Sequence, residues 1–505
     1  MKKKYPIILT TFTLIVYIVM SYGGIRSPDA EIVFRTTEAL STKSTFAVSE
    51  QLSWLEFGLP RGIDGKRYSI FGPGQAIAAI PFYLAANELE RTGWYADLPS
   101  FVPVSFNINK GLSAFVNKRT PNDLRPHSIR AITALLNPVI SSICVLIFFL
   151  LMYEVTGSDI SALITSIVFA FGTLLLPYSG TFFSECLATL FLTSSLYVLI
   201  REKGNDIPYI TLAFSGLLMG FAAFTHLTAI LFAPFFCWFG AYAHLRCRKH
   251  SIRTYMKRMG AYSIGVMFVL IVLAYHNYIR FGDVFETGRT MNPNIIYGSF
   301  VAPWRGLWGL LMSSGKGLLI YCPAVIAGIV LWKPFHKRHR MLSLMIISAA
   351  LFRILFIASR SDWHGGFSLG PRYMVMLVPF LIIPVGLGFK SLFYSGKVKQ
   401  LWIYALITLL FVSEQLYFAI GEVFSYLHIV KWKAEKVGIN VFDDDYLYLD
   451  WSVSPVVHLL DWYRGPLLLS MLPISNISLW LTLTLISGSV LYLIYYRIMK
   501  YMQNK

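Results

Sequence analysis

Three carboxylates stand at the ends of apolar runs, where an acid that meets water could act on a bound substrate. Asp29 follows the first apolar run, Glu31 lies two positions later, and Glu185 begins a further run. A carboxylate in such a place can take the proton of an attacking hydroxyl group. The same residues also suit the first turn of a helix, because that end of the helix dipole favours negative charge. Asp29, Glu31 and Glu185 are therefore candidate catalytic residues, with helix stabilisation as the alternative.

A second group of candidates is basic and lies among glycines. Arg360, His364 and Arg372 fall within residues 359–373, where several glycines allow close approach of the backbone to a ligand. Lys316 stands between two glycines just before another apolar run. Cationic side chains bind phosphate oxygens, and the planar fork of arginine suits them best. We therefore predict that these four residues bind a phosphate group; for Arg360, His364 and Arg372 the alternative is that they anchor at lipid headgroups.

The composition predicts that these residues belong to a membrane protein. Of the 505 residues, 56% are hydrophobic and 14% are charged, with a mean hydropathy of +0.58, whereas soluble domains carry about a quarter charged residues. The net charge of +18 comes from short basic clusters between apolar runs rather than from one basic face. We therefore expect no nucleic-acid partner, and expect membrane lipids and phosphates instead.

Apolar runs long enough to cross the hydrocarbon layer predict about twelve transmembrane helices, since a helix pairs its own backbone amides in lipid. The predicted spans are residues 6–22, 129–153, 160–177, 185–200, 207–224, 227–245, 261–278, 318–332, 342–358, 373–389, 401–420 and 477–496. The expected fold class is an all-α polytopic membrane protein, with residues 1–505 as a single membrane domain.

Basic residues between closely spaced spans set the predicted orientation, because short cytoplasmic loops are rich in Lys and Arg. These residues gather on one side, which places both termini in the cytoplasm of a multi-pass cell-membrane protein. The segments expected to face outside are residues 23–128, 276–317, 359–372 and 422–472. The candidate acids and cations then lie at one water-facing mouth.

Short helices are expected in the first external segment. Ser27 is a suitable N-cap, and Pro28 suits the first helical position. A second apolar stretch, residues 75–86, is too short to span and is expected to lie along the membrane surface. The face of the first helix expected to rest on the membrane carries Ile32, Thr36, Ala39 and Leu40.

The remaining titratable groups require no cofactor. The five cysteines have no metal-ligand spacing and lie in or beside apolar runs, so we expect them to pack in the interior. His226 stands between two apolar runs and is expected to cap a tight turn. Asp29 and Glu31 could offer oxygen ligands to a divalent ion, which leaves a metal open.

Several short strings follow one another through most of the chain. They are Ser27-Pro-Asp-Ala-Glu31, Gly65-Lys-Arg-Tyr-Ser-Ile-Phe-Gly-Pro-Gly74, Phe183-Ser-Glu185, Gly220-Phe-Ala-Ala-Phe-Thr-His226, Tyr278-Ile-Arg-Phe-Gly282, Ser314-Gly-Lys-Gly317 and Gly365-Gly-Phe-Ser-Leu-Gly-Pro-Arg-Tyr373. In order and placement they resemble the GT-C superfamily of membrane glycosyltransferases. The resemblance is to the bacterial branch related to protein O-mannosyltransferases and the lipid A aminoarabinose transferase.

The resemblance implies transfer of a sugar from a polyprenyl-phosphate donor to a glycan, lipid or protein acceptor on the external side, with inversion at the anomeric carbon. Asp29 would be the general base, and Glu31 or Glu185 would orient the acceptor. The leaving phosphate would be held by Lys316, His364 and Arg372, which offset its developing charge.

One departure from the family pattern affects the donor contacts. The aminoarabinose branch has an acid and a lysine before paired prolines in its first loop, where this chain has Ile70-Phe-Gly-Pro-Gly74. Those contacts cannot be carried over, and Lys66 or Arg67 would be the nearest substitutes.

Two other classes of function compete with a glycosyltransferase. A secondary transporter or flippase of envelope glycan or lipid also has about a dozen spans, but transporters place their ionisable residues near the midplane. A non-catalytic subunit of an envelope-assembly complex is the third class. Asp29→Asn separates them, because an enzyme would lose its product whereas a scaffold would not.

Overall fold

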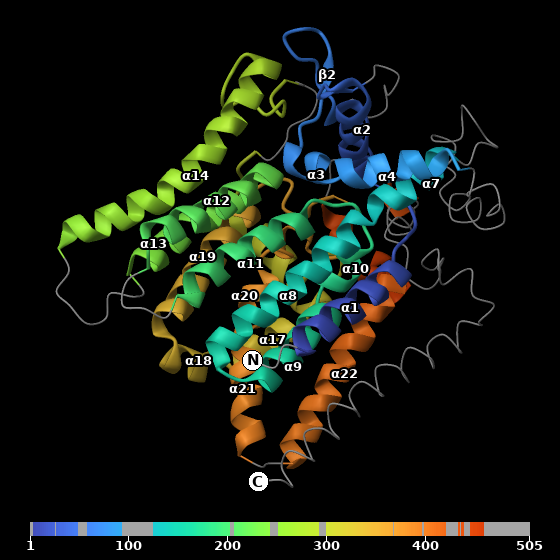
Figure 1. The fold of residues 1–505 in the computed structure, drawn as a ribbon. Coiled ribbons are helices and arrows are strands. Elements are labelled where there is room, and N and C mark those ends of the chain that lie inside the picture. Colours follow the sequence, from blue (N-terminus) through green and yellow to red (C-terminus); the bar gives the residue numbers. More distant parts are fainter. Residues whose placement is uncertain are drawn as a thin grey trace.

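The computed structural model describes residues 4–25, 27–48, 58–92, 125–202, 207–242, 251–291, 299–366, 368–395, 398–420, 433–434, 436–438 and 445–458. They form a helical body in which long helices lie beside one another and shorter helices cross their upper ends (Figure 1). The predicted helical class is thus confirmed. The predicted span 477–496, Cys247 and most of residues 422–472 lie outside the described residues.

Long apolar helices make up the body. They are α1 (Lys4–Val19), α8 (Leu136–Thr156), α9 (Asp159–Phe171), α11 (Glu185–Arg201), α12 (Tyr209–Thr225), α14 (Ile252–Phe281), α19 (Arg340–Ala358) and α22 (Val398–Ile420). Helix α8 packs on α1, α9 and α11, while α12 packs on α11 and α14. Gly216 and Gly265 permit the close crossing of α12 and α14, because a Cβ at either position would lie 2.0 Å from a carbonyl oxygen of the other helix.

Four described helices are long and apolar enough to cross a membrane, judged by length and composition. They cover Ser128–Thr156, Ile252–Phe281, Arg340–Ala358 and Val398–Ile420. Shorter apolar helices, among them α1, α9 and α12, lie beside them. These features point to a membrane protein.

Several predicted spans are broken rather than continuous, and for these the prediction of one unbroken helix was wrong. Proline has no amide hydrogen and clashes with the preceding turn, so Pro323 interrupts one run, while Pro379 and Pro384 each lie in the first turn of a new helix. The resulting pieces are α10 (Leu175–Ser179), η3 (Leu227–Phe232), α13 (Ala233–Tyr242), α16 (Leu318–Tyr321), α17 (Ala324–Val330), η4 (Arg372–Met374), α20 (Val378–Leu381) and α21 (Ile383–Tyr394).

The upper end carries the first predicted external segment and other short elements (Figure 1). The first segment contains α2 (Pro28–Lys43), the antiparallel strands β1 (Ala47–Val48) and β2 (Arg67–Tyr68), α3 (Pro73–Ala78) and α4 (Ile80–Glu90), and α7 (Arg125–Ala134) packs on α4. Elsewhere lie α15 (Pro303–Met312), α18 (Trp332–Arg338), η5 (Tyr446–Tyr448), η6 (Trp451–Val453) and α24 (Pro455–His458).

The side of α2 that was expected to rest on the membrane lies inside the protein instead. Ile32 is fully buried and packs against Val48 and Leu59, while Thr36 and Ala39 are also buried. The residues that follow α2 cover this side, so its apolar groups meet protein rather than lipid. The start of α2 is as predicted, with Ser27 as N-cap and Pro28 in the first turn.

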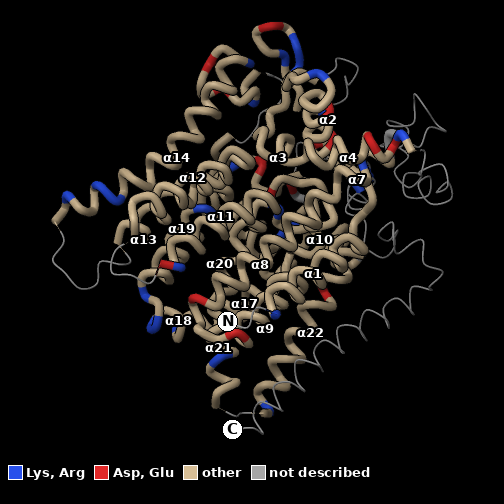
Figure 2. Tube along the Cα trace, viewed as in Figure 1, with Lys and Arg blue, Asp and Glu red and all other residues tan. Residues whose placement is uncertain are grey.

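Charged residues gather mainly at the upper end, at the outer tip of α14 and near α18 and α21, while the middles of the helices are largely uncharged (Figure 2). This distribution suits a body surrounded by lipid, because charges are costly at membrane depth. The ion pairs inside the body are therefore the places to look for function.

Candidate active site

Arg372 joins two acids that lie far apart in the sequence. Its Nη1 donates to Asp29 Oδ2 at 2.7 Å, and its Nε donates to Glu185 Oε1 at 2.7 Å. The guanidinium also lies over the ring of Phe183, with its Cζ 4.6 Å from the ring centroid. Three candidates from separate parts of the sequence therefore meet in one cluster, which we call the Arg372 cluster.

Local backbone structure places each member of this cluster. Asp29 is in the first turn of α2, and Glu185 is the first residue of α11, so both acids lie at positive helix ends. Arg372 follows Gly370, whose φ of +56° is a left-handed conformation that favours glycine. A Cβ at position 370 would lie 2.8 Å from the ring of Tyr321, so both the conformation and the packing require glycine.

The two carboxylate oxygens of Glu185 differ in their bonding, since Arg372 donates to Oε1 and not to Oε2. Its side chain is 1% exposed, and no protein group bonds its Oε2 among the described residues. A buried carboxylate oxygen without a hydrogen-bond donor is costly. A hydroxyl or amine of a bound substrate could therefore satisfy it.

Asp29 differs from Glu185 in its contact with solvent. Its side chain is 26% exposed, and the contact with Arg372 is made through Oδ2. The cluster thus offers a carboxylate that a substrate can reach, beside a guanidinium that suits an anion.

His226 belongs to this neighbourhood, although the sequence predicted only a turn cap. Its Nε2 lies 3.7 Å from Glu185 Oε1, and its Nδ1 is 3.0 Å from Thr228 Oγ1. Burial lowers its pKa well below the ordinary value, and the charges of Arg353 and Arg372 lower it further. The imidazole is therefore neutral at pH 7.

The Gly-Pro-Gly motif explains how the turn before His226 is placed. A Cβ at Gly72 would lie 2.4 Å from the carbonyl oxygen of Phe224, and one at Gly74 would lie 2.3 Å from Thr225 Oγ1. The two glycines therefore let α3 sit directly on the end of α12. The order Gly72-Pro-Gly74 and Phe224-Thr-His226 was visible in the sequence, but nothing in it showed that the two strings meet.

Lys316, which the sequence predicted to bind phosphate, donates to backbone carbonyl oxygens in the structure. Its side chain is fully buried, and its Nζ donates to the carbonyl oxygens of Gly366, at 2.6 Å, and Ser368. Its ammonium also lies 5.3 Å from the ring centroid of Tyr448. Lys316 thus ties the glycine-rich loop that precedes Arg372, and a direct phosphate contact would require these bonds to change.

His364 lies with Lys316 against the ring of Tyr448 rather than in the Arg372 cluster. Its ring stacks on Tyr448 with centroids 4.3 Å apart, and its Nδ1 accepts a hydrogen bond from the amide of Gly366 at 3.0 Å. Burial lowers the pKa of His364 to about 3, with a further contribution from the charge of Lys316. A neutral imidazole is also what the accepted hydrogen bond requires.

Arg360 and Glu31 each form an ion pair outside the Arg372 cluster. Both Nε and Nη2 of Arg360 donate to the carboxylate of Asp362 at 2.7 Å. Glu31 is buried, accepts two hydrogen bonds from Arg130 at 2.6 and 2.9 Å, and accepts another from Arg35 at 2.9 Å. Although burial would raise the pKa of Glu31, the two arginines hold it below its ordinary value.

The described residues offer no obvious metal ligands. Among them, no three His, Cys, Asp or Glu side chains gather closely enough to hold a metal ion. Asp29 and Glu185 share an arginine instead. Lys66 pairs with Asp64, and Arg67 donates to the carbonyl oxygen of Leu59, so neither substitute cation is seen in the Arg372 cluster.

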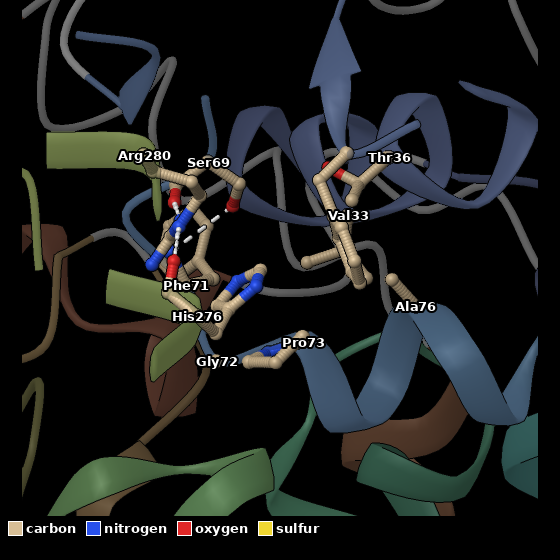
Figure 3. A pocket seen from close by; sticks show the side chains of 10 residues that line it. Val33, Thr36, Ser69, Phe71, Gly72, Pro73, Ala76, His276 and Arg280 are labelled. Carbon is tan, nitrogen blue, oxygen red and sulfur yellow. Dashed lines mark hydrogen bonds between the residues drawn. The ribbon is translucent and has the colours of Figure 1, made fainter. Parts of the chain in front are cut away.

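A separate hollow lies between α2, α3 and the end of α14 (Figure 3). Its lining includes Val33, Phe71 and His276, and none of the predicted site residues. At its edge, Arg280 donates to the carbonyl oxygens of Ser69, at 2.6 Å, and His276, at 3.0 Å. These bonds tie α14 to the segment before α3, so we assign Arg280 a structural role.

Neither the family models nor the curated protein sequences searched gave a match to the chain. Among solved structures, it is similar to ArnT from Cupriavidus metallidurans bound to undecaprenyl phosphate. The identity is 11% and the TM-score 0.44, over 91% of this chain and 78% of ArnT. The apo form of ArnT gives 12% identity and a TM-score of 0.46, over 90% of this chain and 76% of ArnT.

The chain is also similar to an oligosaccharyltransferase from Archaeoglobus fulgidus, crystallised with a tethered acceptor peptide. The identity is 12% and the TM-score 0.47, over 89% of this chain and 59% of that enzyme. Both neighbours are GT-C glycosyltransferases, the superfamily that the sequence strings resemble. At these identities and TM-scores, the function has to be argued from the residues of the site.

Proposed function

We propose that this chain is a membrane glycosyltransferase that moves a sugar from a polyprenyl-phosphate donor to an acceptor on the external side, with inversion. The observation that supports this most is the meeting of Asp29, Glu185 and Arg372. A partly exposed acid and an anion-binding guanidinium are the two groups that such a transfer needs. The acceptor is a glycan, lipid or protein hydroxyl group.

In the proposed reaction, the acceptor oxygen attacks the anomeric carbon from the side opposite the phosphate. The carbon–oxygen bond to the phosphate breaks, and its electron pair leaves with the polyprenyl phosphate. Asp29 takes the proton of the acceptor hydroxyl as general base. Arg372 binds the leaving phosphate and offsets the charge that grows on it.

The shared position of Arg372 couples donor binding to the base. In the structure, the guanidinium bonds to Asp29 and Glu185 at the same time. A phosphate that takes the Nη1 hydrogen bond would release Asp29 Oδ2 for the acceptor proton. The spare Oε2 of Glu185 would accept a hydrogen bond from a substrate hydroxyl and so orient it.

The membrane setting of this proposal comes from the pattern of basic residues. With about twelve spans and both termini in the cytoplasm, Asp29 and Arg372 lie on the external side of the bacterial inner membrane. Polyprenyl carriers are membrane lipids, so a site at a water-facing mouth can meet the donor phosphate and an aqueous acceptor together. No metal is part of the proposed mechanism.

Lipid mass spectrometry on purified protein tests the proposal. We expect polyprenyl phosphate or its sugar conjugate to co-purify with the wild type and with Asp29→Asn, and to be depleted from Arg372→Ala. Arg340→Ala, an exposed arginine at the start of α19, is the matched control. Absence of any polyprenyl lipid from the wild type, or equal amounts in Arg372→Ala, would remove the basis for the donor.

A further inference from the structure

Arg353 is a buried cation that neither the sequence patterns nor the proposed reaction uses. It lies in α19, one of the four helices long and apolar enough to cross a membrane, and its side chain is fully buried. A charged residue in such a helix is expensive and usually has a functional reason. Among the described residues, no carboxylate forms an ion pair with it, so its hydrogen bonds have to supply that reason.

Among the described residues, the hydrogen bonds of Arg353 go to two turns that are distant in sequence. Nε and Nη2 donate to the carbonyl oxygen of Tyr373 at 3.1 and 2.7 Å. Nη1 donates to the carbonyl oxygen of Thr228 at 2.8 Å, and Nη2 reaches Thr228 Oγ1 at 3.3 Å. The guanidinium also lies over the ring of Phe232, 5.3 Å from its centroid.

Each of these turns carries a member of the candidate site. Tyr373 directly follows Arg372, and Thr228 bonds to the ring of His226 at 3.0 Å. The planar guanidinium can donate in both directions at once, which an ammonium on a single stem cannot reproduce. One rigid group therefore sets the spacing between the two turns.

We propose that Arg353 is a positioning residue that holds Arg372 and His226 at their places around Glu185. It touches no reacting atom, so its effect on sugar transfer is indirect and rests on the proposed function. Loss of its bonds would let the turn at 372–374 and the turn at 226–228 move apart. A displacement of about 1 Å at a catalytic group can lower a rate by about 10²-fold.

Hydrogen exchange of the purified, detergent-solubilised protein tests the positioning without any assay of function. The amides of Ala229 and Val375 donate within these turns, to the carbonyl oxygens of His226 and Arg372. In Arg353→Met, both turns should exchange at least several-fold faster, whereas α9 should be unchanged. In Arg353→Lys, which keeps the charge but not the planar fork, both turns should show an intermediate increase.

The transfer rate, measured on the same variants, completes the test. We expect about 10²-fold slower transfer in Arg353→Met, a smaller loss in Arg353→Lys, and no loss in the control Arg340→Met. Unchanged exchange at both turns in Arg353→Met would overturn the positioning role, whatever the rate. If Arg353→Met does not give a monodisperse protein, Arg353→Lys decides by the same criterion. If the wild type transfers no sugar while both turns still loosen, the proposed function fails and the positioning role stands.

Discussion

Asp29 and Glu31 lie two residues apart on α2, and each is bonded by arginine, yet their surroundings differ. Both oxygens of Glu31 are bonded by Arg130, Arg35 adds a further hydrogen bond, and the side chain is 5% exposed. Asp29 contacts Arg372 through one oxygen and is 26% exposed. The fully bonded and buried carboxylate of Glu31 stabilises the structure, whereas the partly exposed carboxylate of Asp29 remains accessible to a substrate.

The arginines of the two regions differ in the same way. Arg130 gives two hydrogen bonds to a single carboxylate, whereas Arg372 divides its hydrogen bonds between two acids from different helices. A buried charge pair with one partner removed leaves an uncompensated charge. In the Arg372 cluster the buried Glu185 still pairs with Arg372 when Asp29 leaves it, so the partly exposed Asp29 can exchange its partner for a ligand. We therefore expect a catalytic role for the Arg372 cluster and a structural role for the ion pairs of Glu31 with Arg130 and Arg35.

The largest expected effect is on the rate of transfer in Asp29→Asn. Loss of the general base should slow transfer by about 10²- to 10⁴-fold, while Glu185 still pairs with Arg372. The rate is measured on protein reconstituted in liposomes with a lipid-linked donor. Glu31→Gln, corrected for the amount of folded protein, is the matched control and should keep more than a tenth of the wild-type rate. Equal losses in both variants would erase the distinction between the two acids.

The next effect is on stability, and it should be larger in Glu31→Gln than in Asp29→Asn. Glu31→Gln removes the buried carboxylate that both Arg130 and Arg35 bond, which should destabilise the fold by about 3–5 kcal/mol. Asp29→Asn should cost much less, because its side chain is partly exposed. Thermal unfolding of the purified variants gives the comparison. Recovery of stability in Glu31→Met with Arg130→Met would confirm that the cost arises from breaking this buried ion pair.

A smaller effect is expected in the affinity for the donor phosphate. Arg372→Lys keeps a positive charge but loses the fork that reaches two acids and a phosphate. We expect binding of polyprenyl phosphate to weaken roughly tenfold, the equivalent of about 1.4 kcal/mol. Competition with a labelled donor measures it. Lys316→Arg should have no such specific effect if Lys316 only ties the loop, and a larger loss there than in Arg372→Lys would assign the phosphate to Lys316 instead.

The last prediction concerns pH and tests whether His364 is neutral in the folded protein. Its folded-state pKa of about 3 lies below the ordinary 6.5, so the unfolded chain binds more protons between these values. The stability from this group is therefore complete above pH 6.5 and falls as the pH drops toward 3, by at most about 1.4 kcal/mol per unit. His364→Asn, whose side-chain oxygen can accept from Gly366, should unfold with a flatter pH dependence. An identical pH dependence in both proteins would show that His364 is not held neutral.

Local signals in the sequence were sufficient for the helical class and for many of the elements. Ser27 and Pro28 mark the true start of α2, and the runs at 342–358 and 401–420 match α19 and α22 closely. Hydropathy alone did not reveal the breaks at Pro323 and Pro379, because the side chains on both sides of each proline remain apolar. It also did not show that Ile32 meets protein rather than lipid, since that depends on residues distant in sequence.

The candidate site shows the same division between local and distant information. Residue type and placement identified Asp29, Glu185 and Arg372, which the structure brings together, although their roles stay predictions. The same signals also selected Glu31 and Lys316. A charged residue beside an apolar run has the same appearance in the sequence whether its partner is a substrate or another part of the protein. The partner is set by packing, and no spacing in the sequence records it. Arg353 was overlooked because it lies inside an apolar run.

A single-turnover experiment with co-purified donor tests the role of Asp29 most directly. Wild-type protein and Asp29→Asn, each loaded with lipid-linked sugar, are mixed with acceptor, and polyprenyl phosphate is measured by mass spectrometry. The account predicts rapid release of polyprenyl phosphate by the wild type, while Asp29→Asn keeps its donor intact over the same time. Release by Asp29→Asn at the wild-type rate would contradict it.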